Sequence, residues 1–108
     1  MKRDNVWKKY TEEDEKALEA VCAGYRAFLD RGKTERECVS ETVRLDRAAG
    51  YRDIEEVIGE GRGLKEGDKV YAVNMKKTIA LFHIGRKTPD QGMMILGAHI
   101  DSPRLDIK

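Results

Sequence analysis

The chain has 108 residues, which is the length of one ordinary domain and too short for two. It carries 21 lysines and arginines against 20 aspartates and glutamates, a formal net charge of +1. This balance excludes a strongly basic nucleic-acid binder, and it excludes an acidic tail that acts through net charge alone. Charged residues make up 38% of the sequence and apolar residues 40%, so a folded core is possible and disorder is not expected.

Cysteine usage and the absence of long apolar runs point to a cytoplasmic protein. Cys22 and Cys38 lie in helix-like patterns, outside any CxxC pair or Cys/His cluster. We therefore predict two buried or half-buried thiols in a reducing compartment. No apolar segment follows the charged start, so no secretion signal is expected. No apolar run approaches the ~20 residues of a membrane span.

The first predicted element is a helix from Thr11 to about Arg31. Thr11 and Asp14 form an N-terminal cap, and four acidic residues in a row favour the positive end of a helix. Apolar residues then recur on one helical face, and Gly32 supplies the stop. The members of that face are Ala17, Leu18, Val21, Tyr25, Phe28 and Leu29.

A second amphipathic helix follows almost at once. Thr34 and Glu37 form a capping box, apolar residues lie along the body, and Gly50 ends the helix. Because so few residues separate the two helices, we predict that they form an antiparallel pair.

A β-hairpin is predicted after a glycine-rich linker. Residues 51–58 suit either a short helical turn or the lead-in to a strand, and residues 59–63 read as a linker. One strand then runs from Lys69 to Asn74 and another from Thr78 to Ile84. The second strand lacks alternation of apolar and polar residues, so we expect both of its faces to be covered.

Residues 93–100 form a continuous apolar run bounded by turn signals. Such a run is typical of a strand that is buried on both faces of a parallel or mixed sheet. A strand of this kind needs neighbouring strands and covering helices, and only eight residues follow Ile100. We therefore expect the chain to be the N-terminal piece of something larger.

The residues suited to chemistry, His99 and Asp101, lie where this apolar run ends. In an extended backbone, residues two apart point to the same side, so these two side chains project together. The carboxyl ends of strands are where sites form in open α/β sheets. A carboxylate that accepts one imidazole N–H makes the other ring nitrogen a better metal ligand. On spacing alone, a structural His–Asp hydrogen bond is the simpler interpretation.

The segment from Gly97 to Lys108 resembles the first metal-binding motif of the aspartyl aminopeptidase and vacuolar aminopeptidase I family of dinuclear metallopeptidases. Residues 94–96 resemble the strand that leads into the motif, and residues 32–37 are similar to bacterial members. Members often carry threonine where this chain has Ile100, a position that faces away from the site.

The resemblance implies a role for each residue of the motif. His99 would be a metal ligand, and Asp101 would be the catalytic-site carboxylate that orients His99. The complete enzyme would hold two divalent metal ions, zinc first, with cobalt and manganese as alternatives. The other ligands and the general-base glutamate follow this motif in the family's order, beyond Lys108. We therefore expect the 108-residue chain to have no peptidase activity alone.

The resulting prediction is an α/β chain with two N-terminal amphipathic helices, a β-hairpin and a buried strand of a larger mixed sheet. Residues 1–58 are expected to be mainly helical and residues 59–108 mainly strands, together the N-terminal portion of a metallopeptidase domain. The implied function is a metal-dependent aminopeptidase that releases N-terminal residues from peptides. The resemblance also implies a homo-oligomer when complete, without nucleic-acid or membrane partners.

Two alternatives compete with the peptidase. A small nucleic-acid-binding β-module is suggested by the turn at residues 63–70 and by local positive charge at Arg62, Lys65, Lys76 and Lys77, although aromatic stacking residues are sparse. A non-catalytic assembly module would act through the two N-terminal helices. The chain has one other histidine, His83. It lies in a predicted apolar strand, where a structural role is favoured over metal binding.

Overall fold

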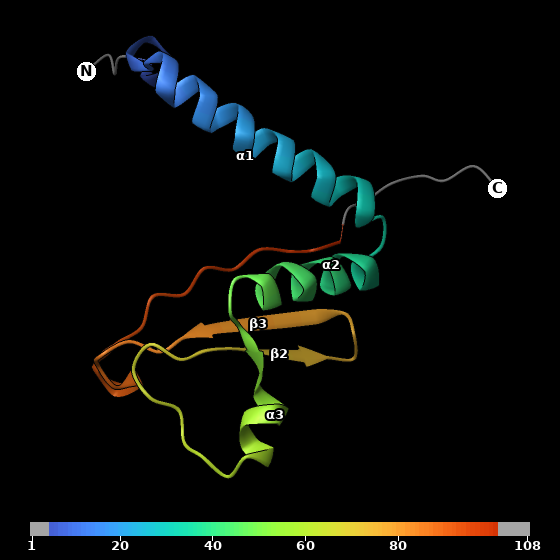
Figure 1. Cartoon of the computed structure of the whole chain (residues 1–108), viewed down its shortest axis with the longest axis vertical. Helices are drawn as coiled ribbons and strands as arrows, with labels where there is room; N and C mark the ends of the chain where they lie inside the picture. Colours follow the sequence, from blue (N-terminus) through green and yellow to red (C-terminus); the bar gives the residue numbers. More distant parts are fainter. Residues whose placement is uncertain (1–4, 102–108) are drawn as a thin grey trace, which may run out of the picture.

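The computed structural model describes residues 5–101 and confirms a mixed α/β fold (Figure 1). Three α-helices and a three-stranded sheet make up most of it. In chain order the elements are the 3-10 helix η1 (Val6–Lys9), α1 (Glu12–Arg31), α2 (Glu35–Ala48), β1 (Arg52–Asp53), α3 (Ile54–Gly59), β2 (Lys69–Asn74), β3 (Thr78–His83) and the 3-10 helix η2 (Pro89–Gln91).

Both long helices begin at the capping boxes that the sequence predicts. The Thr11 hydroxyl accepts a hydrogen bond from the Asp14 backbone N–H at 3.2 Å, and the Asp14 carboxylate accepts one from the Thr11 backbone N–H at 2.8 Å. Thr34 and Glu37 make the same reciprocal pair at the start of α2. Each box satisfies amide groups that have no partner inside the helix, which fixes where the helix starts.

The two helices meet at a tight corner that requires glycine. A Cβ on Gly32 would lie 2.8 Å from the Cys38 Sγ, so the absence of a side chain lets α2 approach the end of α1. Away from this corner α1 leads off from the rest of the chain (Figure 1), and none of its residues is buried. Its apolar face, which the sequence predicts, therefore exists but is not covered within the described residues.

The sheet is mixed and has the order β1-β2-β3. β1 runs parallel to β2, with Arg52 opposite Val70. β2 and β3 form the predicted antiparallel hairpin, with Asn74 opposite Thr78 beside the turn. The sequence left residues 51–58 open between a short helical turn and the lead-in to a strand. The structure contains both, with the short strand β1 followed directly by the helix α3.

A small core lies where α2 and α3 pack on β2. Tyr71 and Val70 of β2 are 2% and 1% exposed, and Val57 of α3 is 2% exposed. Cys38 and Val39 supply the α2 side of this core. The hydrophobic stabilisation of the described chain is thus concentrated between residues 38 and 71.

The expectation that both faces of β3 are covered is wrong for the described chain. All residues of β3 except Ile79 are exposed, with Leu81 and Phe82 at 42% and 46%. β3 pairs with β2 along one edge, and α2 packs near the hairpin. No further layer among residues 5–101 buries its outer side chains, so its apolar composition is not matched by burial.

The predicted buried strand over residues 93–100 is not formed within residues 5–101. The segment has no regular secondary structure, and Met93, Met94, Ile95 and Leu96 are 64%, 90%, 78% and 93% exposed. A strand exists only by hydrogen bonding to a neighbour, and none of the described strands pairs with this segment. Between His83 and residue 101, the described chain therefore adds no further strand.

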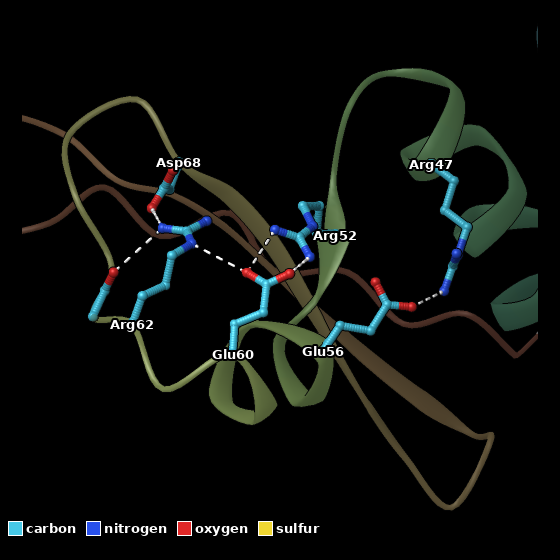
Figure 2. Close-up of polar contacts among 7 residues, drawn as sticks. Arg47, Arg52, Glu56, Glu60, Arg62 and Asp68 are labelled. Carbon is cyan, nitrogen blue, oxygen red and sulfur yellow. Dashed lines mark hydrogen bonds and ion pairs between the residues drawn. The ribbon is translucent and has the colours of Figure 1, made fainter.

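Ion pairs hold the linker between α3 and β2 in place (Figure 2). Glu60 receives hydrogen bonds from Arg52, and Arg62 reaches Glu60 at 3.4 Å and Asp68 at 2.7 Å. The Arg52 guanidinium is the main cause of a lowered pKa at Glu60, and the Arg62 guanidinium has the same effect on the pKa of Asp68. The glycine-rich linker is therefore tied to β1 and to the start of β2.

The hairpin turn places two non-glycine residues in the left-handed region, which gives a first prediction. Met75 and Lys76 have φ of 50° and 58°, as a type I′ turn requires, and glycine is strongly favoured there. We expect Lys76→Gly to raise the free energy of unfolding by about 1 kcal/mol, since relief of strain exceeds the entropic cost of glycine. Urea unfolding followed by far-UV circular dichroism measures the change. Lys77→Gly is the control: it removes the ion pair with Glu35 and should destabilise the chain.

Glu41 on α2 gives a second prediction. Its side chain is 8% exposed and receives hydrogen bonds from Arg44 at 2.6 Å and from Arg31 of α1 at 2.9 Å. These two guanidiniums, Arg44 first, lower the pKa of Glu41 to about 2. Because the folded pKa lies below the unfolded one, this contribution is complete above about pH 4.5 and is lost as the pH falls towards 2.

We therefore expect the urea midpoint of the wild-type chain to fall between pH 5 and pH 3, and the decline to be shallower in Glu41→Gln. Far-UV circular dichroism at both pH values gives the two midpoints. An equally steep decline in the variant would show that Glu41 does not contribute to the acid sensitivity.

Candidate metal-binding site

A cavity of about 520 Å³ lies where the C-terminal segment passes the corner between α1 and α2. One wall comes from the last turns of α1, through Tyr25, Phe28 and Leu29. A second wall comes from residues 32–35 and Cys38, and residues 99–101 close the third side. The capping box of α2 and the glycine at residue 32 therefore shape the space beside His99 and Asp101.

His99 and Asp101 lie side by side, as the alternation of an extended backbone predicts. The His99 Nδ1 is 2.7 Å from the backbone carbonyl oxygen of Asp101 and 3.5 Å from its carboxylate Oδ1. Both side chains are well exposed, at 79% and 77%. The tighter of the two contacts is with the backbone carbonyl, which the sequence does not indicate.

This contact determines which ring nitrogen faces a ligand. A carbonyl oxygen can only accept a hydrogen bond, so the 2.7 Å contact requires a proton on Nδ1 of His99. In the neutral imidazole, Nε2 then carries the free lone pair, which is what a metal ligand needs. The residues present at this position thus fit one ligand of a zinc site, an imidazole nitrogen with a carboxylate beside it.

A complete metal site is not assembled by the described chain. Among residues 5–101, no group of three or more histidine, cysteine, aspartate or glutamate side chains is placed to hold an ion. Cys38 and Glu35 line the same cavity as His99 without forming such a group. The rest of the predicted motif, residues 102–108, lies outside the described residues.

His83 lies apart from this cavity. It is the last residue of β3, is paired opposite Lys69 and is exposed. It does not line the cavity that contains His99. The structure therefore separates the two histidines, and His83 serves as a control position in the experiments below.

The basic residues behind the nucleic-acid alternative are partly neutralised. Arg62 pairs with Asp68 and Glu60, and Lys77 lies 3.6 Å from Glu35. A groove that tracks a phosphate backbone needs unpaired positive charge and exposed aromatic platforms. Tyr71, an aromatic residue of the same hairpin, is instead buried in the core.

The cysteines agree with the prediction of free thiols. Cys22 is half-buried on α1, Cys38 is buried on α2, and both are free. The Cys38 thiol donates a weak hydrogen bond to the Gly32 carbonyl at 3.5 Å. The sequence identified Gly32 as a helix stop but gave no signal that this corner forms a cavity wall.

Comparison with known proteins places the chain in the class of zinc metallopeptidases. Residues 28–108 match the family described as aminopeptidase I zinc metalloprotease (M18). The match covers most of the chain, and the chain belongs to this family.

Curated relatives carry the same family name. A probable M18 family aminopeptidase 1 of Clostridium acetobutylicum is 47% identical over 104 residues, which is 96% of this chain and 22% of the relative. The corresponding protein of Thermotoga maritima is 37% identical over 108 residues. An aspartyl aminopeptidase of Aspergillus oryzae is 30% identical over 92 residues, covering 84% of this chain and 18% of the relative. The chain thus spans about a fifth of the length of these relatives.

The fold agrees with a crystal structure of the same family. Aminopeptidase I from Borrelia burgdorferi B31 superimposes with a TM-score of 0.82 at 30% sequence identity. The match covers 97% of this chain and 25% of that protein. Among residues 5–101, no helix is both long and apolar enough to cross a membrane.

Proposed function

We propose that this chain supplies the first metal ligand of an M18 aminopeptidase that releases N-terminal residues from peptides. The observation that carries the proposal is the His99–Asp101 pair beside a cavity, in which the contact at Nδ1 leaves the lone pair of His99 on Nε2. Membership of a zinc metalloprotease family supports the same role. The relatives named aminopeptidase support the reaction, and the one named aspartyl aminopeptidase supports a peptide substrate.

Each residue of the pair has a separate task in this proposal. His99 binds the metal through Nε2. Asp101 holds the ring through the contacts at Nδ1, which fixes its orientation and tautomer and makes Nε2 a stronger donor. The complete site would hold two divalent ions, zinc first and cobalt or manganese as alternatives. When bound, such ions polarise the scissile carbonyl and activate water near neutral pH.

The proposal also gives the exposed apolar segment after η2 a structural role. Residues 1–108 form the N-terminal portion of the peptidase domain, and residues 93–100 become a strand once neighbouring strands are present. The high exposure of Met94 and Leu96 supports this, because apolar side chains at 90% and 93% exposure are costly to leave in water. We further propose a cytoplasmic enzyme that assembles as a homo-oligomer.

A chimera tests the proposed function. Residues 1–108 replace the matching N-terminal part of the Clostridium acetobutylicum relative, with which the chain is 47% identical. We expect the purified, zinc-loaded chimera to hydrolyse aminoacyl amides and the isolated 108-residue chain to show no turnover. A folded chimera that binds zinc but lacks activity would contradict the proposal, as would turnover by the isolated chain.

A further inference from the structure

The cavity next to the candidate metal site has an apolar wall that metal binding does not use. Tyr25, Phe28 and Leu29 line it from the last turns of α1. Ile100 lines it from the C-terminal segment, which passes the α1–α2 corner at this point (Figure 1). Ile100 is half-buried whereas residues 93–99 are exposed, so the segment contacts the corner here. The volume of about 520 Å³ lies within the ~300–1,000 Å³ that is usual for small-ligand pockets.

The polar side chains on the corner are already paired within the chain. The Thr34 hydroxyl is engaged in the capping box that starts α2. Lys33 Nζ lies 3.7 Å from the Asp30 carboxylate, and Lys77 Nζ lies 3.6 Å from the Glu35 carboxylate. A ligand group that enters the cavity along this wall therefore meets apolar side chains, and a charged group would lose water there without gaining a new partner.

The position of the cavity relates this wall to the proposed reaction. His99 and Asp101 form one side of the same cavity whose other side is the apolar wall of α1. In the proposed function, the scissile peptide bond lies at the metal that His99 binds. The side chains on either side of that bond are then the substrate groups that lie beside the cavity.

We propose that this cavity, the corner pocket lined by Tyr25, Phe28, Leu29 and Ile100, receives an apolar side chain of the peptide substrate next to the scissile bond. The inference rests on the proposed function and adds the class of substrate to it. Burial of an apolar side chain against this wall supplies the binding energy. An extra few methylene groups in such a pocket typically change the specificity by about 10–200-fold.

The chimera with the Clostridium acetobutylicum relative tests the pocket with three zinc-assisted reactions. The substrates are alanylalanine, leucylalanine and alanylleucine. We expect kcat/KM for one of the two leucine dipeptides to exceed that for alanylalanine by at least about tenfold. Preference for leucylalanine would place the residue before the scissile bond in the pocket, and preference for alanylleucine would place the residue after it there. Equal values for all three dipeptides would overturn the proposal.

Leu29→Lys and Leu45→Lys are a matched pair of variants. Both leucines are 44% exposed on helices, and lysine is a good helix former, but only Leu29 lines the corner pocket. Leu29→Lys should reduce the preference for leucine to less than about threefold, whereas Leu45→Lys should leave it unchanged. Leu29→Ala should reduce it in the same direction by a smaller factor. Calorimetric titration with uncleavable reduced-amide analogues of the three dipeptides should show the same changes in Kd.

The outcomes separate this inference from the function on which it rests. A folded wild-type chimera that does not cleave alanylalanine would remove the proposed function itself. Cleavage of alanylalanine with the same leucine preference in Leu29→Lys and Leu45→Lys would leave the peptidase in place and overturn the corner pocket. Unfolding of Leu29→Lys alone, seen by far-UV circular dichroism, would also overturn it, because the wall would then be covered by another part of the enzyme.

Discussion

Replacing His99 with alanine in the chimera with the Clostridium acetobutylicum relative is expected to abolish most of its peptidase activity. Removal of a residue that merely orients a metal-bound histidine typically costs about 10–100-fold, so loss of the ligand itself should cost more than about 100-fold in kcat/KM. The zinc content of the purified protein should fall in parallel, because one site then lacks its nitrogen donor. Steady-state kinetics and elemental analysis measure the two effects.

The other residues of the pair and of the chain supply the controls. Asp101→Asn keeps the backbone carbonyl that lies 2.7 Å from His99 Nδ1 and loses only the carboxylate at 3.5 Å, so we expect about a 10–100-fold loss. His83→Ala removes the exposed histidine at the end of β3 and should leave activity and zinc content unchanged. Equal effects of His83→Ala and His99→Ala would contradict the assignment of the ligand.

Replacing Tyr71 with alanine is expected to unfold most of the described core. Tyr71 is 2% exposed on β2, and its hydroxyl accepts a hydrogen bond from Arg47 Nε at 2.9 Å. Truncation of a large buried aromatic residue typically costs about 3–5 kcal/mol. This is a large share of the ~5–15 kcal/mol that stabilises a small domain. Few other apolar side chains are buried in the described chain, so little else contributes to its hydrophobic stabilisation.

The matched variant Tyr71→Phe keeps the ring and removes only the hydroxyl. Arg47 retains its ion pair with Glu56 at 2.9 Å through another nitrogen, and because its side chain is half-exposed, water can replace the lost partner of Nε. We expect a loss of about 1 kcal/mol. Urea unfolding followed by far-UV circular dichroism gives both values, since Trp7 lies at 63% exposure and is a poor reporter of the core. Similar losses for the two variants would show that the ring is not the main contributor.

Local signals in the sequence predicted the elements that depend on local physics. The capping boxes at Thr11 and Thr34 place the helix starts correctly because they act within three residues of the backbone. The apolar residues within 69–74 and the short turn after them predict the hairpin for the same reason. Whether an apolar segment is buried depends on what packs against it. This is why β3 is exposed and residues 93–100 form no strand in the described chain, where the other layers of the larger sheet are absent.

In the candidate site, too, the sequence predicts the features that depend on neighbouring residues and misses those that depend on distant ones. The alternation of side chains placed His99 and Asp101 together, since that depends on two neighbouring residues alone. The backbone carbonyl as the closer partner of Nδ1 depends on the path of the chain after residue 99, which spacing does not specify. The cavity brings the α1–α2 corner beside residues 99–101, which lie more than 60 positions later in the sequence, and no local signal encodes such a pairing.

The tautomer of His99 is the most direct test of the proposed metal ligand. Long-range ¹H–¹⁵N correlation spectra of the imidazole rings, recorded above pH 7.5 on the 108-residue chain, distinguish a protonated from an unprotonated ring nitrogen. His99 should carry its proton on Nδ1, with Nε2 bare, and His83 supplies an internal comparison. A proton on Nε2 of His99 would leave no lone pair for a metal on the exposed nitrogen and would contradict the role given to this residue.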